Sequence, residues 1–312
     1  MGKIECFKIR ILEFASEKDI FNIGKGQAIK TVSCLKPYFL ANPITIVADP
    51  FLFVHNDRLY LFYESKNRYN PGVIQMISTT DLKTWSQPKT VLSELFHISF
   101  PYVFSDGGQV YMIPETGLDN SIRLYEAVDN SLSEFRLCKK LLVQPSGTNV
   151  TMGYADSAVV KMNDIYYLLT TLQYTDKINT LELYYSDSLK GEYKVHPQSP
   201  VLRSQEYGRN AGALQFIDGK LYRYSQDCSV RYGDNVNVSE VQELSREVYK
   251  EVLVHKDIFP SGLPFYKDGG HQYNMVNFKG HILSATDAKE YHRLSLQKHI
   301  HSLSKLIARI SQ

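Results

Sequence analysis

The sequence has 312 residues and a nearly balanced charge, with 35 Lys and Arg against 33 Asp and Glu and a formal net charge of +2. This balance gives no strong electrostatic case for a nucleic-acid partner, although it leaves room for local basic patches. The length suits one large all-β domain or two ordinary domains, and it allows a substantial core. Tyr and Phe are plentiful, at 22 and 15, which is typical of aromatic-lined strands.

The four cysteines show no CxxC or other metal-ligand spacing, and we predict no metal ligands: Cys6, Cys34, Cys138 and Cys228. The sequence shows neither a signal peptide nor an apolar run long enough to span a bilayer. We therefore expect a cytoplasmic protein.

Residues 1–45 predict one strand followed by loops. Polar and apolar residues alternate over residues 6–12, and Gly24, Gly26, Pro37 and Pro43 follow.

From Val47 a pattern recurs, in which a tight turn is followed by an aromatic-rich strand. Five units align on the first apolar residue after the turn: Leu59, Val110, Ile165, Leu221 and Ile282. Successive anchors are 51, 55, 56 and 61 residues apart, which fits four short strands and their loops per unit. The fold class is therefore predicted as all-β, a five-bladed β-propeller. A β-sandwich with long loops is the alternative.

Further strands recur after the anchors, over residues 73–78, 122–127, 181–186 and 236–244. The fifth unit runs out of extended pattern after Asp287. We therefore expect a strand from the N-terminal segment, including Ile9 to Leu12, to complete its blade and close the ring.

The last residues change period. Apolar residues at 296, 300, 303, 307 and 310 share one helical face, which predicts a C-terminal amphipathic helix over 291–312 after a propeller over 1–290. The helix either packs on the propeller or makes a peripheral membrane or partner contact, with Lys298, Lys305 and Arg309 off its apolar face.

Two rings of residues are candidates for the site at one end of the propeller channel. The starts of the inner strands form the first ring: Asp49, Phe100, Asp156, Ala211 and His271. The positions five residues after the anchors form the second, polar throughout: Glu64, Glu115, Thr170, Gln226 and Asp287. Asp49 and Asp156 either cap their strands or supply acid/base chemistry for sugars, while Glu64 and Glu115 either bond neighbouring blades or line the site.

Two local sequences are unusual. In residues 208–213, small residues flank Arg209 and Asn210 and leave room for something to approach the backbone. Arg209 forms either a structural salt bridge or an anion site for a phosphorylated donor. His271, after Gly269 and Gly270, is either a satisfied histidine or a general base or donor on the channel.

Familiar catalytic motifs are missing. The sequence has no GxGxxG, GxxxxGK, GxSxG or HExxH, and no DxD triplet of the metal-dependent glycosyltransferases. Dinucleotide, P-loop, α/β-hydrolase and zincin chemistries therefore receive no support.

Several of these motifs resemble known families. Residues 48–51, 59–64 and 78–85 resemble five-bladed propellers of the arabinanase and β-xylosidase type. More specifically, residues 100–104, 113–116, 226–228 and 232–233, with Arg209 and Gly212, are similar to the N-terminal propeller domain of glucosamine inositolphosphorylceramide transferases and its stand-alone bacterial relatives. The resemblance covers about residues 45 to 290.

The hydrolases in this resemblance use an Asp of the first blade as base, an Asp of the second as modulator and a Glu of the third as acid. Asp49 matches the first position, but Phe100 and Asp156 stand at the other two. These departures put simple glycoside hydrolysis in doubt, and the bacterial relatives imply a transferase of capsule or lipopolysaccharide assembly.

The hypothesis is therefore a glycosyltransferase that moves a sugar or phosphoribosyl-type group from a phosphate-activated donor to a glycan acceptor, in the cytoplasm or at the inner face of the membrane. Asp49, Asp156 and His271 are the predicted catalytic residues. The predicted substrate-binding residues are Glu64, Glu115, Arg209, Asn210, Gln226, Asp227, Tyr273, Asn274 and Asp287. No cofactor is indicated, and a rearranged glycoside hydrolase and a non-catalytic glycan-binding propeller are the alternatives.

Overall fold

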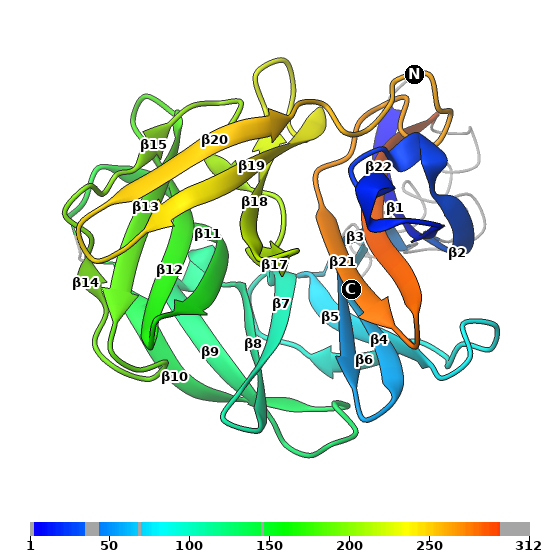
Figure 1. The fold of residues 1–312 in the computed structure, drawn as a ribbon, viewed down its shortest axis with the longest axis horizontal. Coiled ribbons are helices and arrows are strands. Elements are labelled where there is room, and N and C mark those ends of the chain that lie inside the picture. The colour runs from blue at the N-terminus through cyan, green and yellow to red at the C-terminus, as the bar shows by residue number, and fades with distance from the viewer. Residues whose placement is uncertain (1–2, 35–43, 68–69, 145–146, 294–312) are drawn as a thin grey trace, which may run out of the picture.

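The computed structural model describes residues 3–34, 44–67, 70–144 and 147–293, and in these ranges the chain forms five antiparallel sheets around a central axis (Figure 1). Each sheet is one blade, and the innermost strands β3, β7, β11, β16 with β17, and β21 surround the axis. The predicted all-β five-bladed propeller is confirmed.

The first four blades are built from strands in chain order. Blade one contains β3 (Ile44–His55), β4 (Arg58–Asn67), β5 (Val73–Thr79) and β6 (Lys89–Leu92). Blade two contains β7 (Ser99–Asp106), β8 (Gln109–Glu115), β9 (Ser121–Ala127) and β10 (Phe135–Val143). Blade three contains β11 (Val150–Met162), β12 (Ile165–Tyr174), β13 (Asn179–Ser186), β14 (Lys194–Val195) and β15 (Leu202–Arg203). Blade four contains β16 (Arg209–Asn210), β17 (Gln215–Ile217), β18 (Lys220–Asp227), β19 (Asn235–Leu244) and β20 (Tyr249–His255).

The fifth blade joins the two ends of the described chain. Its inner strands are β21 (Tyr273–Phe278) and β22 (His281–Arg293), and its outer strands are β1 (Lys3–Phe14) and β2 (Gln27–Ser33). β1 pairs with β22 along its whole length, and Ile9 lies opposite Asp287 (Figure 1). The predicted closure by an N-terminal strand is confirmed, although the segment supplies two strands where we expected one.

The five innermost hairpins turn in the same way. Both turn residues have positive φ in every blade: Asn56 and Asp57, Gly107 and Gly108, Asn163 and Asp164, Asp218 and Gly219, and Lys279 and Gly280. Two positive φ values define the type I′ turn, whose twist matches that of the flanking strands. Asn, Asp and Gly tolerate this backbone, so the turn signals in the sequence correctly set the register of all five units.

Helices contribute little to the described ranges, which contain three short 3₁₀ helices and no α-helix. They are η1 (Glu17–Asp19), η2 (Ile23–Lys25) and η3 (Gly117–Asp119). Over the same ranges, no helix has the length and apolar character to cross a bilayer. β22 continues to Arg293, and the helix predicted for 291–312 otherwise falls on 294–312, outside the described residues.

Apolar side chains fill the spaces between neighbouring blades. The T-shaped contact of Phe51 with Phe100, whose ring centroids are 4.9 Å apart, joins blades one and two. Tyr102 of blade two donates to the Val159 carbonyl of blade three at 2.7 Å. Because these contacts fix the blades to one another, side chains at one end of the inner strands are held in register around the axis.

Candidate functional site

The inner strands of the first three blades share a bulge at the first predicted ring. Pairing with the second strand skips in the same way each time, between Ala48 and Phe51, between Ser99 and Tyr102, and between Ala155 and Ala158. Each bulge holds a residue with positive φ, namely Asp49 (53°), Phe100 (47°) and Asp156 (48°). The prediction placed Asp49 and Asp156 at strand starts, but they lie inside β3 and β11, because the bulge interrupts the strand.

The fully buried carboxylate of Asp287 connects blades five and one. Its Oδ1 accepts the backbone N–H groups of His271 at 2.8 Å and Gln272 at 3.1 Å, and its Oδ2 accepts that of Asp49 at 3.2 Å. Asp49 Oδ2 in turn accepts the N–H of Phe100 in blade two at 3.0 Å. Asp49 therefore does not cap its own strand, since it bonds the backbone of the next blade.

The His271 side chain lies between two of these carboxylates. Its Nδ1 is 2.7 Å from Asp287 Oδ2 and 3.6 Å from Asp49 Oδ1. The contact with Asp287 is a close charge pair in which the ring N–H does not aim at the oxygen. Because Nδ1 faces the carboxylates, Nε2 is the nitrogen left to meet a substrate. The neighbouring Gln272 is also buried, and neither atom of its amide has a hydrogen-bond partner among the described residues.

Blades three and four meet through Asp156 and Arg209. Arg209 Nε donates to Asp156 Oδ2 at 2.5 Å, and Gln226 Nε2 donates to the same oxygen at 3.1 Å. Asn210 Nδ2 donates to the Asp156 carbonyl at 2.8 Å. Arg209 Nη2 lies 3.5 Å from Glu115 Oε2 of blade two, so this one guanidinium contacts carboxylates of two blades. The structural salt bridge is therefore present, with Nη2 beside Glu115 and Nη1 donating to Met152 Sδ at 3.6 Å.

Burial and mutual repulsion separate the pKa values of the carboxyl groups. Burial, and then the nearby charges of Asp156 and Asp287, raise the pKa of Asp49 to about 6, although His271 opposes the shift. Burial and the charge of Asp156 raise the pKa of Glu115 to about 8 against the opposing effect of Arg209. At neutral pH, Asp49 is ionised and Glu115 carries a proton, which is the division of labour of a base and an acid.

The same carboxylates stabilise the charged forms of His271 and Arg209. Burial by itself lowers the pKa of His271, but the carboxylates of Asp287 and Asp49 outweigh it, so the pKa is raised. Burial also acts against the charged form of Arg209, but Asp156 and Glu115 reverse its effect and raise the pKa. Arg209 and His271, whose charged forms these carboxylates favour, thus stand within reach of one group of carboxyls.

Glu64 is the residue that blade one contributes to the second predicted ring. Its Oε1 lies 3.7 Å from His97 Nε2, and burial raises the pKa of this carboxyl well above its ordinary value. Burial lowers the pKa of His97 to about 4, so the imidazole is neutral at pH 7. Burial and the neighbouring charge of Asp49 thus favour the neutral form of Glu64, and the carboxyl lies beside a neutral histidine.

Two aromatic side chains, Tyr232 and Phe7, form an aromatic wall beside Arg209 and His271, and neither was among the predicted site residues. Tyr232 lies 46% exposed on the loop between β18 and β19, with its ring 5.2 Å from the Arg209 guanidinium and 5.2 Å from the His271 ring. Phe7 of β1 stacks on His271 at 4.8 Å. Lys289 Nζ lies 5.6 Å from the Phe7 ring and donates to the Tyr232 carbonyl. The predicted ring closure was the available signal for Phe7, because it brings β1 beside β22.

Three predicted binding residues lie elsewhere or serve the backbone. Tyr273 is fully buried and its hydroxyl donates to the Ile20 carbonyl at 2.9 Å, so this hydroxyl serves the fold. Asn274 Oδ1 accepts the N–H of Leu52 at 2.6 Å and bonds blade five to blade one. Asp227 Oδ1 accepts the N–H of Ser229 at 2.8 Å and shapes the start of the Tyr232 loop.

The small residues after Arg209 admit the neighbouring strand. A Cβ on Gly212 would lie 2.1 Å from the Tyr273 carbonyl oxygen, and the Tyr273 N–H donates to the Ala211 carbonyl at 2.8 Å. Something does approach this backbone closely, as the sequence indicated. It is the inner strand of blade five, so Gly212 serves blade packing.

The residues around His271 could also hold a cation. One ligand atom each from Asp49, His271 and Asp287 lie within 4.8 Å of one another. Asp287, however, already accepts three backbone N–H groups, and this satisfies most of its capacity. The arrangement therefore fits a hydrogen-bonded anchor for His271 better than a metal centre.

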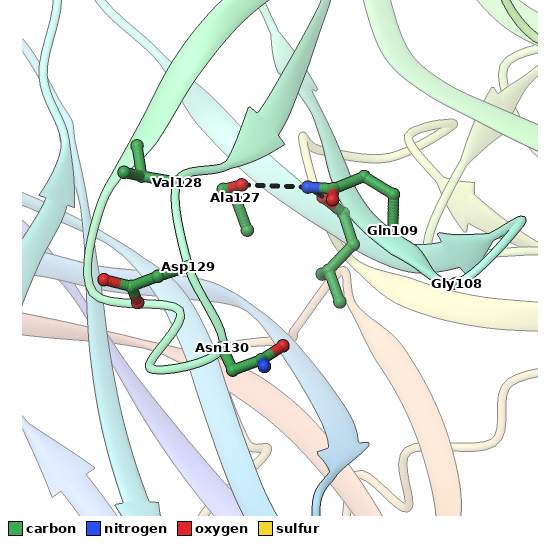
Figure 2. A pocket seen from close by; sticks show the side chains of 7 residues that line it. Gly108, Gln109, Ala127, Val128, Asp129 and Asn130 are labelled. Atoms are coloured by element: carbon green, nitrogen blue, oxygen red, sulfur yellow. Dashed lines mark hydrogen bonds between the residues drawn. The ribbon is translucent and has the colours of Figure 1, made fainter.

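A separate pocket of about 170 Å³ lies between the turn that joins β7 to β8 and the loop after β9, where Gly108, Gln109 and Asn130 line it (Figure 2). Gln109 Nε2 donates to the Ala127 carbonyl at 2.8 Å, and Asp129 Oδ1 accepts the N–H of Ser131. Because these polar groups serve their own loop, the channel end with its paired charges is the better candidate.

Comparison with known proteins shows the family of this chain. The family model described as glucosamine inositolphosphorylceramide transferase 1, N-terminal, matches residues 17–279. Glucosamine inositolphosphorylceramide transferase 1 of Arabidopsis thaliana is 36% identical over 242 residues, which are 75% of this chain and 30% of that protein. The protein of the same name from Oryza sativa subsp. japonica is 35% identical over 254 residues, 79% of this chain and 32% of that protein. The chain thus spans about a third of the length of these relatives.

The solved structures that are similar in fold include two glycoside-active enzymes. A family 117 glycoside hydrolase from the marine bacterium Zobellia galactanivorans aligns with a TM-score of 0.56 and 12% identity, over 92% of this chain and 90% of that one. The Cellvibrio cellulosa α-L-arabinanase, in complex with arabinohexaose, aligns with a TM-score of 0.50 and 14% identity, over 66% and 77% of the two chains. At these identities the likeness concerns the fold alone.

Proposed function

Because the chain belongs to the family of the N-terminal domain of glucosamine inositolphosphorylceramide transferase 1, we propose that it is a glycosyl-transfer enzyme whose site is the channel end around Asp49, Arg209 and His271. The observation that carries the proposal is the buried guanidinium of Arg209, which lies 2.5 Å from Asp156 and 3.5 Å from Glu115, with His271 3.6 Å from Asp49 on the other side. Sugar transfer needs a base, an acid and a cation for a departing phosphate, and these groups supply all three.

In the proposed reaction, Asp49 accepts the proton of an acceptor hydroxyl while that oxygen bonds the anomeric carbon of the donor. The bond from this carbon to the donor phosphate breaks, and Arg209 and His271 stabilise the charge on the leaving phosphate. Asp156, whose Oδ2 already accepts two hydrogen bonds, positions Arg209. This assignment keeps Asp49 as the base and moves Asp156 from base to positioning residue.

The aromatic wall supports a sugar ligand. Tyr232 exposes part of its ring directly beside the two cations, where the apolar face of a sugar ring packs well on an aromatic face. Glu115, protonated at neutral pH, would donate to a sugar or phosphate oxygen next to Arg209.

Finer parts of the proposal rest on the resemblance of sequence motifs. We propose a phosphate-activated sugar or phosphoribosyl donor, and a capsule or lipopolysaccharide glycan as acceptor, at the cytoplasmic face of the membrane. The relatives are named for a transferase that is about three times longer than the matched region, so their substrate is not assigned to this chain.

Glycoside hydrolysis is the second candidate, because the same base and acid would serve with water as the acceptor. The divergent pKa values of Asp49 and Glu115 favour it as much as they favour transfer. Arg209 and His271 favour transfer, since hydrolysis of a plain glycoside produces no phosphate to stabilise.

A thermal-shift screen with two arms separates the candidates. One arm contains sugar nucleotides and phosphoribosyl pyrophosphate, and the other contains oligosaccharides without a donor; each uses the wild type and Arg209→Lys. Transfer predicts stabilisation by an activated donor that Arg209→Lys weakens. Release of reducing sugar without a donor would establish a hydrolase, and oligosaccharide binding without turnover would establish a glycan-binding module.

A further inference from the structure

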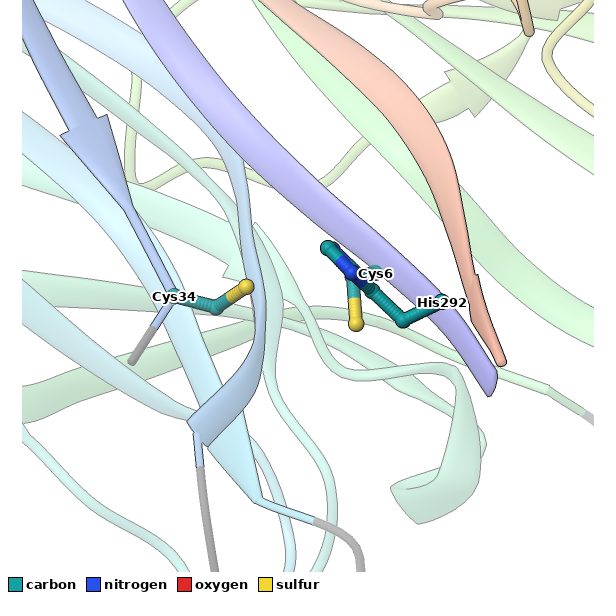
Figure 3. Close-up of side chains that lie close together, drawn as sticks. All are labelled: Cys6, Cys34 and His292. Atoms are coloured by element: carbon teal, nitrogen blue, oxygen red, sulfur yellow. The ribbon is translucent and has the colours of Figure 1, made fainter. Parts of the chain in front are cut away.

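A second cluster of metal-ligating side chains lies on the closing blade. Cys6 belongs to β1, Cys34 follows the end of β2, and His292 belongs to β22 (Figure 3). Their sulfur and nitrogen ligand atoms all lie within 4.8 Å of one another. Cys6 is buried, and the other two residues are half-buried. The three ligands therefore come from β1, from the end of β2 and from β22. The Cys6 thiol is protected from solvent, whereas a solvated ion can reach Cys34 and His292.

The cluster is distinct from the channel site. Phe7, the next residue after Cys6, stacks on His271. Successive side chains of a strand point to opposite faces of its sheet, so Cys6 faces away from the channel. An ion held by Cys6 would thus leave the channel chemistry untouched.

The ring of His292 is already oriented by a carboxylate. Its Nε2 lies 2.8 Å from Glu290 Oε1, and the other oxygen of Glu290 lies 2.6 Å from Lys8 Nζ. With Nε2 engaged, Nδ1 is the nitrogen available to the thiols. Proteins commonly fix metal-binding histidines in this way, with a carboxylate on the nitrogen that does not bind the metal.

We propose that Cys6, Cys34 and His292 bind one Zn²⁺ that ties β1, β2 and β22 together. Two thiolates and an imidazole are ligands that zinc prefers, with water in the fourth position. With Zn–S bonds of about 2.3 Å, tetrahedral sulfurs stand about 3.8 Å apart, so binding requires a contraction of about 1 Å or less. Each thiol releases its proton to solvent as its sulfur bonds the ion.

The bound Zn²⁺ would stabilise the closing blade. The three strands belong to the blade that joins the N-terminal segment to the end of the described chain, where strand pairing and side-chain contacts such as that of Lys8 with Glu290 close the ring. An ion bound only by the folded arrangement stabilises that arrangement by mass action. We expect one equivalent of Zn²⁺ to raise the Tm of the reduced protein.

Cobalt gives a direct test. The reduced, metal-free protein is titrated with Co²⁺, and the thiolate-to-cobalt charge-transfer band is recorded before and after Zn²⁺ is added. We expect one equivalent of Co²⁺ to produce the band and Zn²⁺ to abolish it. Because Asp49, His271 and Asp287 contain no sulfur, binding in the channel would give no such band.

Three variants complete the test. Cys34→Ser and His292→Asn change half-buried side chains, and Cys138→Ser removes a half-buried thiol of blade two as the matched control. We expect the first two to lose the band and the Zn²⁺-induced rise in Tm, while Cys138→Ser keeps both. The absence of a band in the wild type, a band that survives Cys34→Ser and His292→Asn, or a reduced protein that takes up no Zn²⁺ and only forms a disulfide between Cys6 and Cys34 on oxidation would overturn the proposal.

Discussion

Arg209 Nε donates to Asp156 Oδ2 at 2.5 Å, and this ion pair joins the broken inner strand of blade four to the bulge of blade three. Both side chains are largely buried, with exposures of 11% and 3%. A buried pair of this kind stabilises little compared with apolar residues, but the loss of one partner is costly because the other charge stays buried.

Arg209→Met should therefore lower the free energy of unfolding by about 3 to 5 kcal/mol. The double variant Asp156→Asn with Arg209→Met should lose less than the sum of the single changes, because it removes both charges. Urea denaturation of the four proteins measures the coupling. Arg203→Met, which breaks the exposed pair of Arg203 with Asp176, is the control and should change little. Additive effects at Asp156 and Arg209 would show that the pair is not coupled.

Asp49→Asn separates catalysis from architecture at the first bulge. The amide oxygen of Asn can still accept the N–H of Phe100, so Tm should stay close to the wild-type value. Activity should fall by about 100-fold or more, because an amide cannot accept the acceptor's proton. Asp49→Ala should lose both activity and stability, since no acceptor remains for this buried N–H. Unfolding of Asp49→Asn itself would mean that the carboxylate serves the fold.

The sequence predicted the framework of this site better than its contacts. Turn residues and spacing fixed five units, because every inner hairpin depends on local chemistry such as that of Asn56 and Asp57. The ring positions of Asp49 and Asp156 also followed from register. The direction of Tyr273 did not, because its hydroxyl depends on the carbonyl of Ile20, which reaches it only through ring closure.

Tyr232 and the Cys6 cluster were missed for a related reason. Tyr232 stands on a loop whose path depends on hydrogen bonds such as that of Asp227 with Ser229. Cys6 and His292 are 286 residues apart in the sequence, and they meet only because β1 pairs with β22. The spacing of cysteines and histidines in the sequence therefore could not predict contacts that form only when the ring closes.

The pH dependence of activity should be bell-shaped, with limbs near pH 6 and pH 8. The acidic limb follows Asp49, which must lose its proton to act as a base, and the alkaline limb follows Glu115, which must keep its proton to donate. Glu115→Gln should flatten the alkaline limb and keep the acidic one. Rates measured from pH 5 to 9 with one donor test this, and an unchanged alkaline limb in the variant would remove Glu115 from the mechanism.

Stability should fall as the pH rises from about 4.5 to about 8. In this window the unfolded chain has ionised Glu115, whose ordinary pKa is 4.5, whereas the folded protein keeps the proton until about pH 8. The folded state therefore binds more protons, and deprotonation favours unfolding. Asp49, whose pKa is raised to about 6, acts in the same direction up to that pH.

Glu115→Gln should accordingly show a smaller fall in Tm between pH 5 and pH 8 than the wild type. The exposed residue Glu134 supplies the control, since Glu134→Gln should follow the wild-type curve. Differential scanning calorimetry in buffers of low ionisation enthalpy gives both curves. Parallel curves for the wild type and Glu115→Gln would contradict a raised pKa at this carboxyl.

Tyr232→Ala tests the aromatic wall independently of the acid and base. The residue Tyr232 is 46% exposed and its backbone carbonyl still accepts from Lys289, so the fold should tolerate the change. Loss of stacking on a sugar should weaken binding about tenfold, which corresponds to about 1.4 kcal/mol. Tyr232→Phe keeps the ring and should bind normally, and Val230→Ala on the same loop, where Val230 is 82% exposed, is the matched control. Calorimetric titration with the sugar nucleotide that gives the largest thermal shift measures all four proteins. Equal affinity in Tyr232→Ala would contradict a sugar stacked on this ring beside Arg209 and His271, each of which lies 5.2 Å from it.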